Sequence, residues 1–292
     1  MCDEDTVNDL EKFEKKSSHL SRRQFNTLTA GAAIAAMLPA VANAMPVSES
    51  DVVITTPDGE ADCYFVHPAN GKHPAVLIWP DILGLRPAFR QMGKRLAESG
   101  YAVLVVNPYY RGAKSPVVKE GDSFQDPEVR NSVMPYYRAL SAKTTTTDAV
   151  AMVNFLDGQR VVDTVKKIGT TGYCMGGPMT LLTAAAIPHR IGAVGSFHGG
   201  GLVTGESSSP HLLIPNMDAH FLIAIADNDD TKYPEVKGVL RKAYDSAGLK
   251  AEIEVYEGAL HGWCPPDSRA YHAVQAERAW SRLLAVFGDA LV

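Results

Sequence analysis

The chain carries little excess charge of either sign, and this limits the partners that it can have. Its 292 residues include 28 Lys and Arg against 33 Asp and Glu, which gives a formal net charge of −5. Proteins that bind nucleic acid usually show a basic excess, so no nucleic-acid partner is expected. Downstream of residue 45 there is also no apolar run of about 18 residues, the length that a transmembrane helix needs. With 46% apolar residues, the sequence predicts a soluble globular body.

Cysteine is scarce as well. The chain has Cys2, Cys63, Cys174 and Cys264, with no C-x-x-C pair and no Cys/His spacing typical of zinc ligands. No metal and no cofactor are therefore expected. Loss of Cys2 with a cleaved leader would leave three cysteines, an odd number, so at least one thiol is expected to lack a partner within the chain.

Residues 1–44 have the parts of an export signal. Arg22 and Arg23 precede a stretch of small and apolar residues at 28–41, and Ala42-Asn43-Ala44 matches an A-x-A cleavage site. Paired arginines before a weakly hydrophobic stretch favour a twin-arginine-type signal over an amphipathic N-terminal helix. We therefore expect the twin-arginine export machinery as a partner, a periplasmic or exported product without a stable membrane anchor, and a single domain at 45–292.

Apolar strands alternate with helices along this domain. A hairpin is predicted at 51–66, and buried strands at 73–80, 101–106, 167–173, 191–197, 221–226 and, with one polar face, 251–257. Helices are predicted from about residue 87, at 145–157, at about 234–248 and around 280–287. This alternation predicts an α/β protein with a mostly parallel, doubly wound sheet and helices on both faces. Segments 109–143 and 199–218 interrupt the rhythm directly after strands, where ligand crevices form.

The segment Gly172-Tyr173-Cys174-Met175-Gly176 joins a predicted strand to a predicted helix. This is the pattern of a nucleophile elbow with cysteine in place of serine. The turn is so tight that side chains two residues before and after the nucleophile would collide, which explains the glycines. A helix N-terminus favours a thiolate on Cys174, and the N–H of Met175 would face a developing oxyanion.

A base and an acid follow in the order that this arrangement requires. His261 comes after the last predicted strand, on a loop at the carboxyl edge of the sheet. The strand before it ends in Asp227-Asn228-Asp229-Asp230. Asp229, a turn beyond the strand end, is the preferred partner of His261, and Asp227 remains the alternative.

The chain resembles the dienelactone hydrolase family over nearly all of residues 50–290. The matching segments are Asp81 to Leu85, Asn107 to Arg111, Gly172 to Gly177, Asp229, and Tyr256 to Trp263. The resemblance implies an α/β-hydrolase fold, no cofactor, and hydrolysis of an enol-lactone or related ester by Cys174, His261 and Asp229. It also implies an oxyanion hole formed by the N–H groups of Met175 and Ile82.

The same resemblance implies further contacts and two departures. Asp81 stands where a glutamate holds or deprotonates the thiol, and Arg111 stands at one of two positions whose arginines bind a substrate carboxylate. The second of those positions falls in Cys264-Pro265-Pro266, so an anionic substrate would have one arginine partner rather than two. Tyr110 and Trp263 could form an apolar wall of the site, although aromatic residues near strand ends more often pack in the core.

The sequence thus predicts acyl transfer to Cys174 through a thioester, on a small-molecule ester or lactone. Two other interpretations stay open at this stage. A thiol redox protein would use Cys174 with Cys264, and a catalytically inert hydrolase fold would only bind a ligand or partner.

Overall fold

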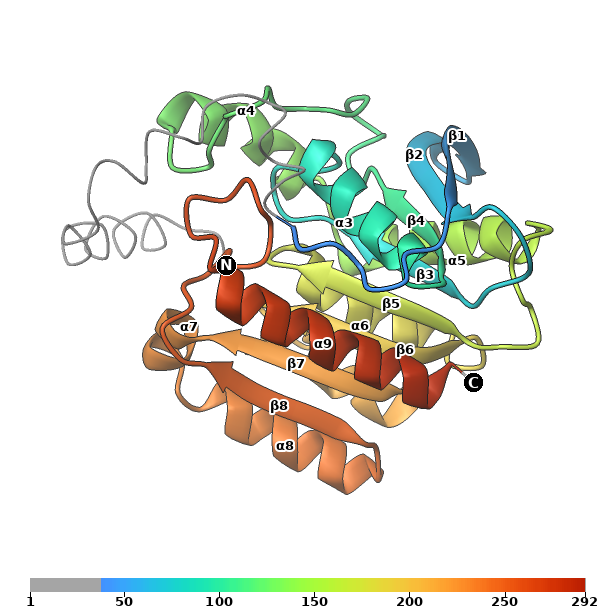
Figure 1. Cartoon of the computed structure of the whole chain (residues 1–292). Helices are drawn as coiled ribbons and strands as arrows, with labels where there is room; N and C mark the ends of the chain where they lie inside the picture. Colours follow the sequence, from blue (N-terminus) through green and yellow to red (C-terminus); the bar gives the residue numbers. More distant parts are fainter. Residues whose placement is uncertain (1–37, 292) are drawn as a thin grey trace.

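The computed structural model describes residues 38–291, which form a twisted eight-stranded sheet with helices on both faces (Figure 1). The strands are β1 (Val47–Thr56), β2 (Gly59–Pro68), β3 (Ala75–Trp79), β4 (Ala102–Val106), β5 (Ile168–Tyr173), β6 (Ile191–Phe197), β7 (His220–Ala226) and β8 (Ala251–Tyr256). The helices are α3 (Pro87–Glu98), α4 (Pro127–Arg138), α5 (Ala142–Asp157), α6 (Gly176–Ala186), α7 (Asp227–Lys232), α8 (Val236–Ala247), α9 (Ala273–Ala290) and the 3₁₀ turn η1 (Pro210–Asn216). Residues 1–37 of the predicted signal segment lie outside the described residues.

The strand order is β1-β2-β4-β3-β5-β6-β7-β8. β1 and β2 form the predicted hairpin, and β2 pairs antiparallel with β4. The strands β4, β3, β5, β6, β7 and β8 run parallel to one another. The carboxyl ends of β3 and of β5 to β8 therefore lie at one edge of the sheet. Loops that leave this edge are the usual site of ligand binding in such folds.

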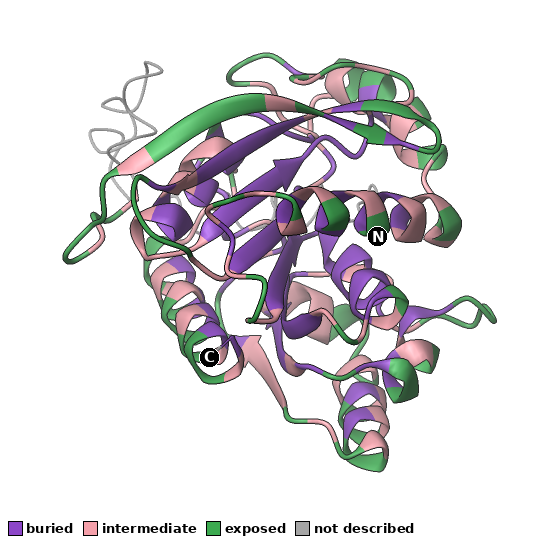
Figure 2. Ribbon diagram, turned by 90° about the vertical axis from the view of Figure 1, so that its right-hand side faces the viewer, coloured by how far each residue is buried: buried purple, intermediate pink, exposed green. Residues whose placement is uncertain are grey.

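Each strand of the central sheet contributes to two apolar layers, because successive side chains point to opposite faces. In β3, Leu77 and Trp79 pack with α5, α6 and α8, whereas Val76 and Ile78 pack with α3 and α9. Figure 2 shows the inner strands buried on both sides, with the edge strands β1 and β8 more exposed. The predicted α/β fold with helices on both faces is confirmed.

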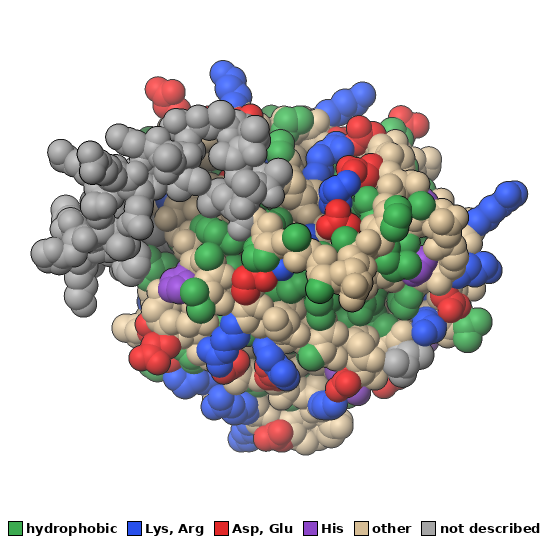
Figure 3. Space-filling model, viewed as in Figure 1, with side chains coloured by type: hydrophobic (Ala, Val, Ile, Leu, Met, Phe, Trp, Pro, Cys, Tyr) green, Lys and Arg blue, Asp and Glu red, His purple; other side chains and the backbone are tan. Residues whose placement is uncertain are grey.

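The surface matches the balanced composition. On the face in Figure 3, acidic and basic side chains alternate, and the polar residues of β8 pair with α9: Glu252 contacts Arg282, and Glu254 contacts Arg278. Within residues 38–291, no helix combines the length and apolar character needed to cross a bilayer.

Three short elements were not expected from the sequence. α4 and η1 form within the two segments that interrupt the strand–helix rhythm, and α7 begins directly at the end of β7. In α4, Val133 is the one fully buried side chain, so the helix lacks the continuous apolar stripe that makes a helix recognisable in sequence.

Candidate active site

Four neighbouring parallel strands each end next to a residue of the site. Cys174 follows β5, His198 follows β6, Asp229 lies in α7 just after β7, and His261 lies on the loop after β8. Residues that are distant in sequence therefore meet at one edge of the sheet.

Cys174 occupies a strained turn between β5 and α6. Its φ is +53°, a left-handed conformation that residues other than glycine seldom adopt. The turn is fixed by two backbone hydrogen bonds, from the N–H of Cys174 to the carbonyl of Phe197 (3.0 Å) and from the N–H of Gly177 to the carbonyl of Cys174 (3.0 Å). The side chain, 5% exposed, thus stands at the N-terminus of α6, where the helix dipole favours a negative charge.

The glycines around Cys174 allow backbone segments to approach closely. A Cβ atom on Gly172 would lie 2.1 Å from the carbonyl oxygen of Gly176. A Cβ atom on Gly176 would lie 2.2 Å from the carbonyl oxygen of Trp79, at the end of β3. Gly172 is therefore required by the turn itself, and Gly176 by the packing of α6 against the neighbouring strand.

His261 is held by the short helix α7, directly after β7. Its Nδ1 atom lies 2.7 Å from Oδ2 of Asp229, and its backbone N–H donates to Oδ1 of Asn228 (2.8 Å). The other two carboxylates of α7 have different partners: Asp227 accepts from the N–H of Gly258 (2.8 Å), and Asp230 pairs with Lys237. Asp229, the preferred residue in the sequence, is thus the one whose carboxylate meets the imidazole.

Ile82 and Met175 lie beside one buried phenol. The hydroxyl group of Tyr109 donates to the carbonyl of Ile82 (2.8 Å) and lies 3.1 Å from the sulfur of Met175. Burial raises the pKa of Tyr109 well above its ordinary value, so the group remains a donor. Tyr109 therefore joins the two residues predicted to supply the oxyanion hole, a role that the sequence did not indicate.

Asp81 is engaged by an arginine that the sequence analysis did not single out. Arg86, 5% exposed, donates to both oxygens of Asp81 (2.6 and 2.9 Å) and to both oxygens of Asp267 (2.6 and 2.9 Å). The same Asp81 carboxylate accepts from the N–H of Leu83 (2.9 Å). Asp81 therefore shapes the loop after β3 and ties it, through Arg86, to the segment that follows His261.

Arg111 and Tyr110 do not lie where the sequence analysis expected them, in contact with the substrate. Arg111 pairs with Asp148 of α5 (2.7 Å) and with Asp58 of the β1–β2 turn (2.6 Å). Tyr110 donates to Asp148 (2.8 Å) and shares a hydrogen bond with Thr56 (2.7 Å). Both residues therefore brace the hairpin against α5, and neither lines the cavity beside Cys174.

Trp263 does not form a wall of the pocket either. It is fully buried, stacked on Tyr256 with ring centroids 5.1 Å apart, and belongs to the layer that packs with α3 and α9. This is the core packing that the sequence analysis gave as the more frequent arrangement.

A cavity of about 270 Å³ opens next to Cys174. Its walls come from the N-terminal half of α6, the segment from α4 to α5, and the loop after β6, and they consist of Tyr137, Arg138, Leu140, Ser141, Thr145, Met175, Pro178, Met179, Leu182 and Gly200. Apolar side chains predominate, and Arg138 is the charged one. Both segments predicted to wall the pocket contribute. No group of three potential metal ligands is found within residues 38–291.

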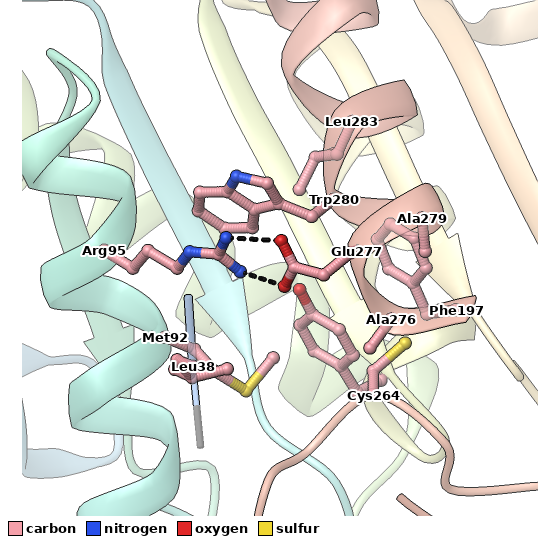
Figure 4. A pocket seen from close by; sticks show the side chains of 11 residues that line it. Leu38, Met92, Arg95, Phe197, Cys264, Ala276, Glu277, Ala279, Trp280 and Leu283 are labelled. Atoms are coloured by element: carbon pink, nitrogen blue, oxygen red, sulfur yellow. Dashed lines mark hydrogen bonds and ion pairs between the residues drawn. The ribbon is translucent and has the colours of Figure 1, made fainter. Parts of the chain in front are cut away.

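Cys264 lies away from this cavity. It faces a separate space of about 20 Å³ between α3 and α9, near the Arg95–Glu277 ion pair (Figure 4). Cys264 is a free thiol in the α3/α9 layer, whereas Cys174 belongs to the layer on the other face of the sheet. The Cys174–Cys264 pair of the redox interpretation is therefore not formed. Burial raises the pKa of the Cys264 thiol well above its ordinary value.

A sheet of this topology, with a nucleophile elbow after β5 and the histidine after the last strand, defines an α/β-hydrolase fold. The model of the dienelactone hydrolase family matches residues 61–291, and the chain belongs to that family. It is therefore a hydrolase of the dienelactone hydrolase type.

Relatives agree with this assignment. The chain is 28% identical over 226 residues to a protein of Escherichia coli K12 provisionally named carboxymethylenebutenolidase, covering 75% of this chain and 78% of that protein. A protein of Methylorubrum extorquens AM1 with the same provisional name is 26% identical over 256 residues, covering 86% and 84%.

Solved structures share the fold. A crystal structure from Klebsiella pneumoniae, provisionally described as a dienelactone hydrolase, aligns with a TM-score of 0.72 at 23% identity and covers 83% of this chain and 99% of that one. A dienelactone hydrolase-like promiscuous phosphotriesterase from metagenomic libraries gives a TM-score of 0.69 at 19% identity, covering 84% and 99%.

The glycine contacts predict a large loss of stability for Gly172→Ala. The new Cβ atom would meet backbone atoms that cannot rotate away, so we expect a loss of about 3 kcal/mol, or a thermal midpoint lower by about 6–12 °C. Gly238→Ala is the matched control, because Gly238 lies inside α8 with nothing within 4 Å of an added Cβ. It should gain about 0.5–1 kcal/mol. Equal midpoints for the two variants in thermal unfolding would contradict this account of the turn.

Proposed function

We propose that this chain hydrolyses a carboxylic ester or lactone through a triad of Cys174, His261 and Asp229 and a thioester acyl-enzyme. The observation that carries the proposal is the 2.7 Å contact between Nδ1 of His261 and Asp229. A carboxylate on Nδ1 leaves Nε2 as the atom that exchanges a proton with the nucleophile and the leaving group. The strained position of Cys174 at a helix N-terminus supports its role as the nucleophile.

In the acylation step, the thiolate of Cys174 attacks the carbonyl carbon, and the electron pair of the C=O bond moves to oxygen. The N–H groups of Met175 and Ile82 stabilise this oxyanion. When the tetrahedral intermediate collapses, the bond to the leaving oxygen breaks, and His261 delivers the proton that it took from the thiol. An enol or aryl oxygen suits this step, because a simple alkoxide is a poorer leaving group than the thiolate, and the intermediate would then collapse back to the substrate.

In the deacylation step, His261 removes a proton from water, and the resulting hydroxide attacks the thioester carbonyl. The C–S bond then breaks, and the thiolate and His261 return to their starting state. Asp229 compensates the positive charge that His261 carries in both steps and fixes its tautomer.

The cavity indicates the kind of acyl group that the site accepts. A volume of about 270 Å³ suits a small molecule, and its mainly apolar walls favour an uncharged acyl portion. Arg111 and Arg86 are each paired with two carboxylates of the protein. A negatively charged substituent on the substrate would therefore meet Arg138 rather than either of these residues.

We further propose that the enzyme acts in the periplasm after export by the twin-arginine route and cleavage after Ala44. The support is the order of parts in residues 1–44: Arg22 and Arg23, a weakly hydrophobic stretch, and the A-x-A motif.

Cys174→Ala is expected to abolish turnover, because no other group at the elbow can form the acyl-enzyme. The loss in kcat should be at least about 1,000-fold, and Cys174→Ser should leave little activity. Initial rates on enol esters, aryl esters and lactones, measured at neutral pH with a thiol reductant, test this, together with mass spectrometry of a trapped thioester. Near-normal hydrolysis by Cys174→Ala would rule out the mechanism.

Asp229→Asn is expected to lower kcat by about 100- to 10,000-fold, because the amide favours the wrong tautomer of His261. Asp230→Asn is the matched control: Asp230 is the next residue of the same helix but pairs with Lys237. Its kcat should stay within about threefold of the wild type. Equal losses in the two variants would show that a general disturbance of α7, rather than the loss of the Asp229 carboxylate, is responsible.

Replacing Arg22 and Arg23 together by lysine is expected to leave the chain unprocessed in the cytoplasm, because the export signal loses its arginine pair. Cell fractionation and N-terminal sequencing measure this, with a mature start at Met45 for the wild type. Lys15→Gln combined with Lys16→Gln is the control and should be exported normally. Export of both double variants to the same extent would contradict the twin-arginine assignment.

A further inference from the structure

His198 lies at the centre of the site but has no part in the cycle described above. It directly follows β6, between the strand that leads to Cys174 and the strand that leads to Asp229. Its backbone N–H donates to the carbonyl of Ala224 in β7 (2.8 Å), which fixes the residue to the sheet edge.

The imidazole of His198 is enclosed by other rings. Its centroid lies 5.0 Å from that of His261, with the planes at 60°, and 5.0 Å from that of Trp263, with the planes at 66°. Tyr173 is on a third side, with a centroid distance of 6.2 Å. The residue is 1% exposed. A substitution of His198 would therefore directly change the surroundings of the His261 ring.

Two features make histidine a costly choice at this position. Its φ is +40°, in the left-handed region that disfavours side chains. Among the described residues, neither ring nitrogen has a hydrogen-bond partner, although buried polar atoms normally do. A phenylalanine would fill a similar space without burying two unpaired nitrogens, so packing alone does not account for an imidazole here.

The surroundings keep this imidazole neutral. Burial lowers the pKa of His198 well below its ordinary value of 6.5, and the charge of His261 lowers it further. The titratable groups that face it are His261, from the loop after β8, and Tyr173, from β5, whose own pKa is raised by burial. The carboxylate of Asp229 contacts His261 and not His198. A neutral ring offers a dipole and a lone pair to a neighbouring cation without repelling it.

We propose that His198 is a positioning residue that supports the ring of His261 and stabilises its protonated form. In the reduced protein, that form arises when the Cys174 S–H bond breaks and its proton moves to Nε2 of His261, leaving the thiolate and the imidazolium as an ion pair. This inference rests on the proposed function and adds to it a group that favours the ion pair without touching the substrate.

The test compares His198→Phe with the wild-type full chain. After reduction and removal of the reductant, the rate of iodoacetamide alkylation at Cys174 is followed between pH 4 and 9 by mass spectrometry of its peptide. The variant keeps an aromatic ring but loses both nitrogens, so the ion pair weakens and the alkylation midpoint should rise by about one pH unit. We also expect kcat to fall about tenfold with KM within about twofold.

Trp263→Phe is the matched control, because the ring of Trp263 also contacts the imidazole of His198. It should leave the alkylation midpoint unchanged. An unchanged midpoint in a folded His198→Phe, or an equal shift in Trp263→Phe, would overturn the proposal. Should His198→Phe fail to fold, NMR titration of the wild-type imidazoles decides: the titration midpoint of His198 must lie well below the ordinary value of 6.5. An ordinary titration of His198 would overturn the proposal.

The two hypotheses fail in different ways. Turnover by Cys174→Ala would refute the proposed function whatever the His198 variants do. An inactive Cys174→Ala combined with a normal alkylation midpoint in His198→Phe would refute only the role of His198.

Discussion

The close approach of α6 to the end of β3 is the constraint on which the site depends. Gly176 lies against the carbonyl of Trp79, and this contact holds the first turn of the helix at the sheet edge. The left-handed turn at Cys174 follows from it, because the chain must reverse within a few residues between β5 and α6. The helix dipole, the N–H of Met175 and the loop after β3 are thereby brought together around one sulfur atom.

Much of this arrangement could be predicted from local sequence. Buried strands are apolar runs, the elbow is a contiguous motif, and His261 follows the last strand. Each of these features can therefore be recognised within a short stretch of sequence. The choice of Asp229 over Asp227 was a weaker inference, because three carboxylates follow β7 and their directions depend on α7, which has no buried residue to reveal it. Only the fold shows that Asp227 faces Gly258 instead.

The ion-pair partners of the arginines could not be predicted from the sequence. Arg111 is close in the chain to a strand end, but its partners Asp58 and Asp148 come from the hairpin and from α5. Arg86 meets Asp267, which is 181 residues away in the chain. The partners of long polar side chains are determined by the tertiary fold, and the spacing of residues in the sequence does not predict these partners. The same holds for His198, whose only signal in the sequence was its place at a strand end.

Arg86 has a mechanical consequence for the enzyme. One buried guanidinium clamps the loop that carries Ile82 and the loop that carries His261, so neither can swing outward without exposing an unpaired buried charge. The ion pairs of Arg86 thus connect the loop after β3 to the segment after His261. Breaking this connection would leave charged groups unpaired in a buried position, so the connection favours a site arranged before a substrate binds over one that forms by closing a lid.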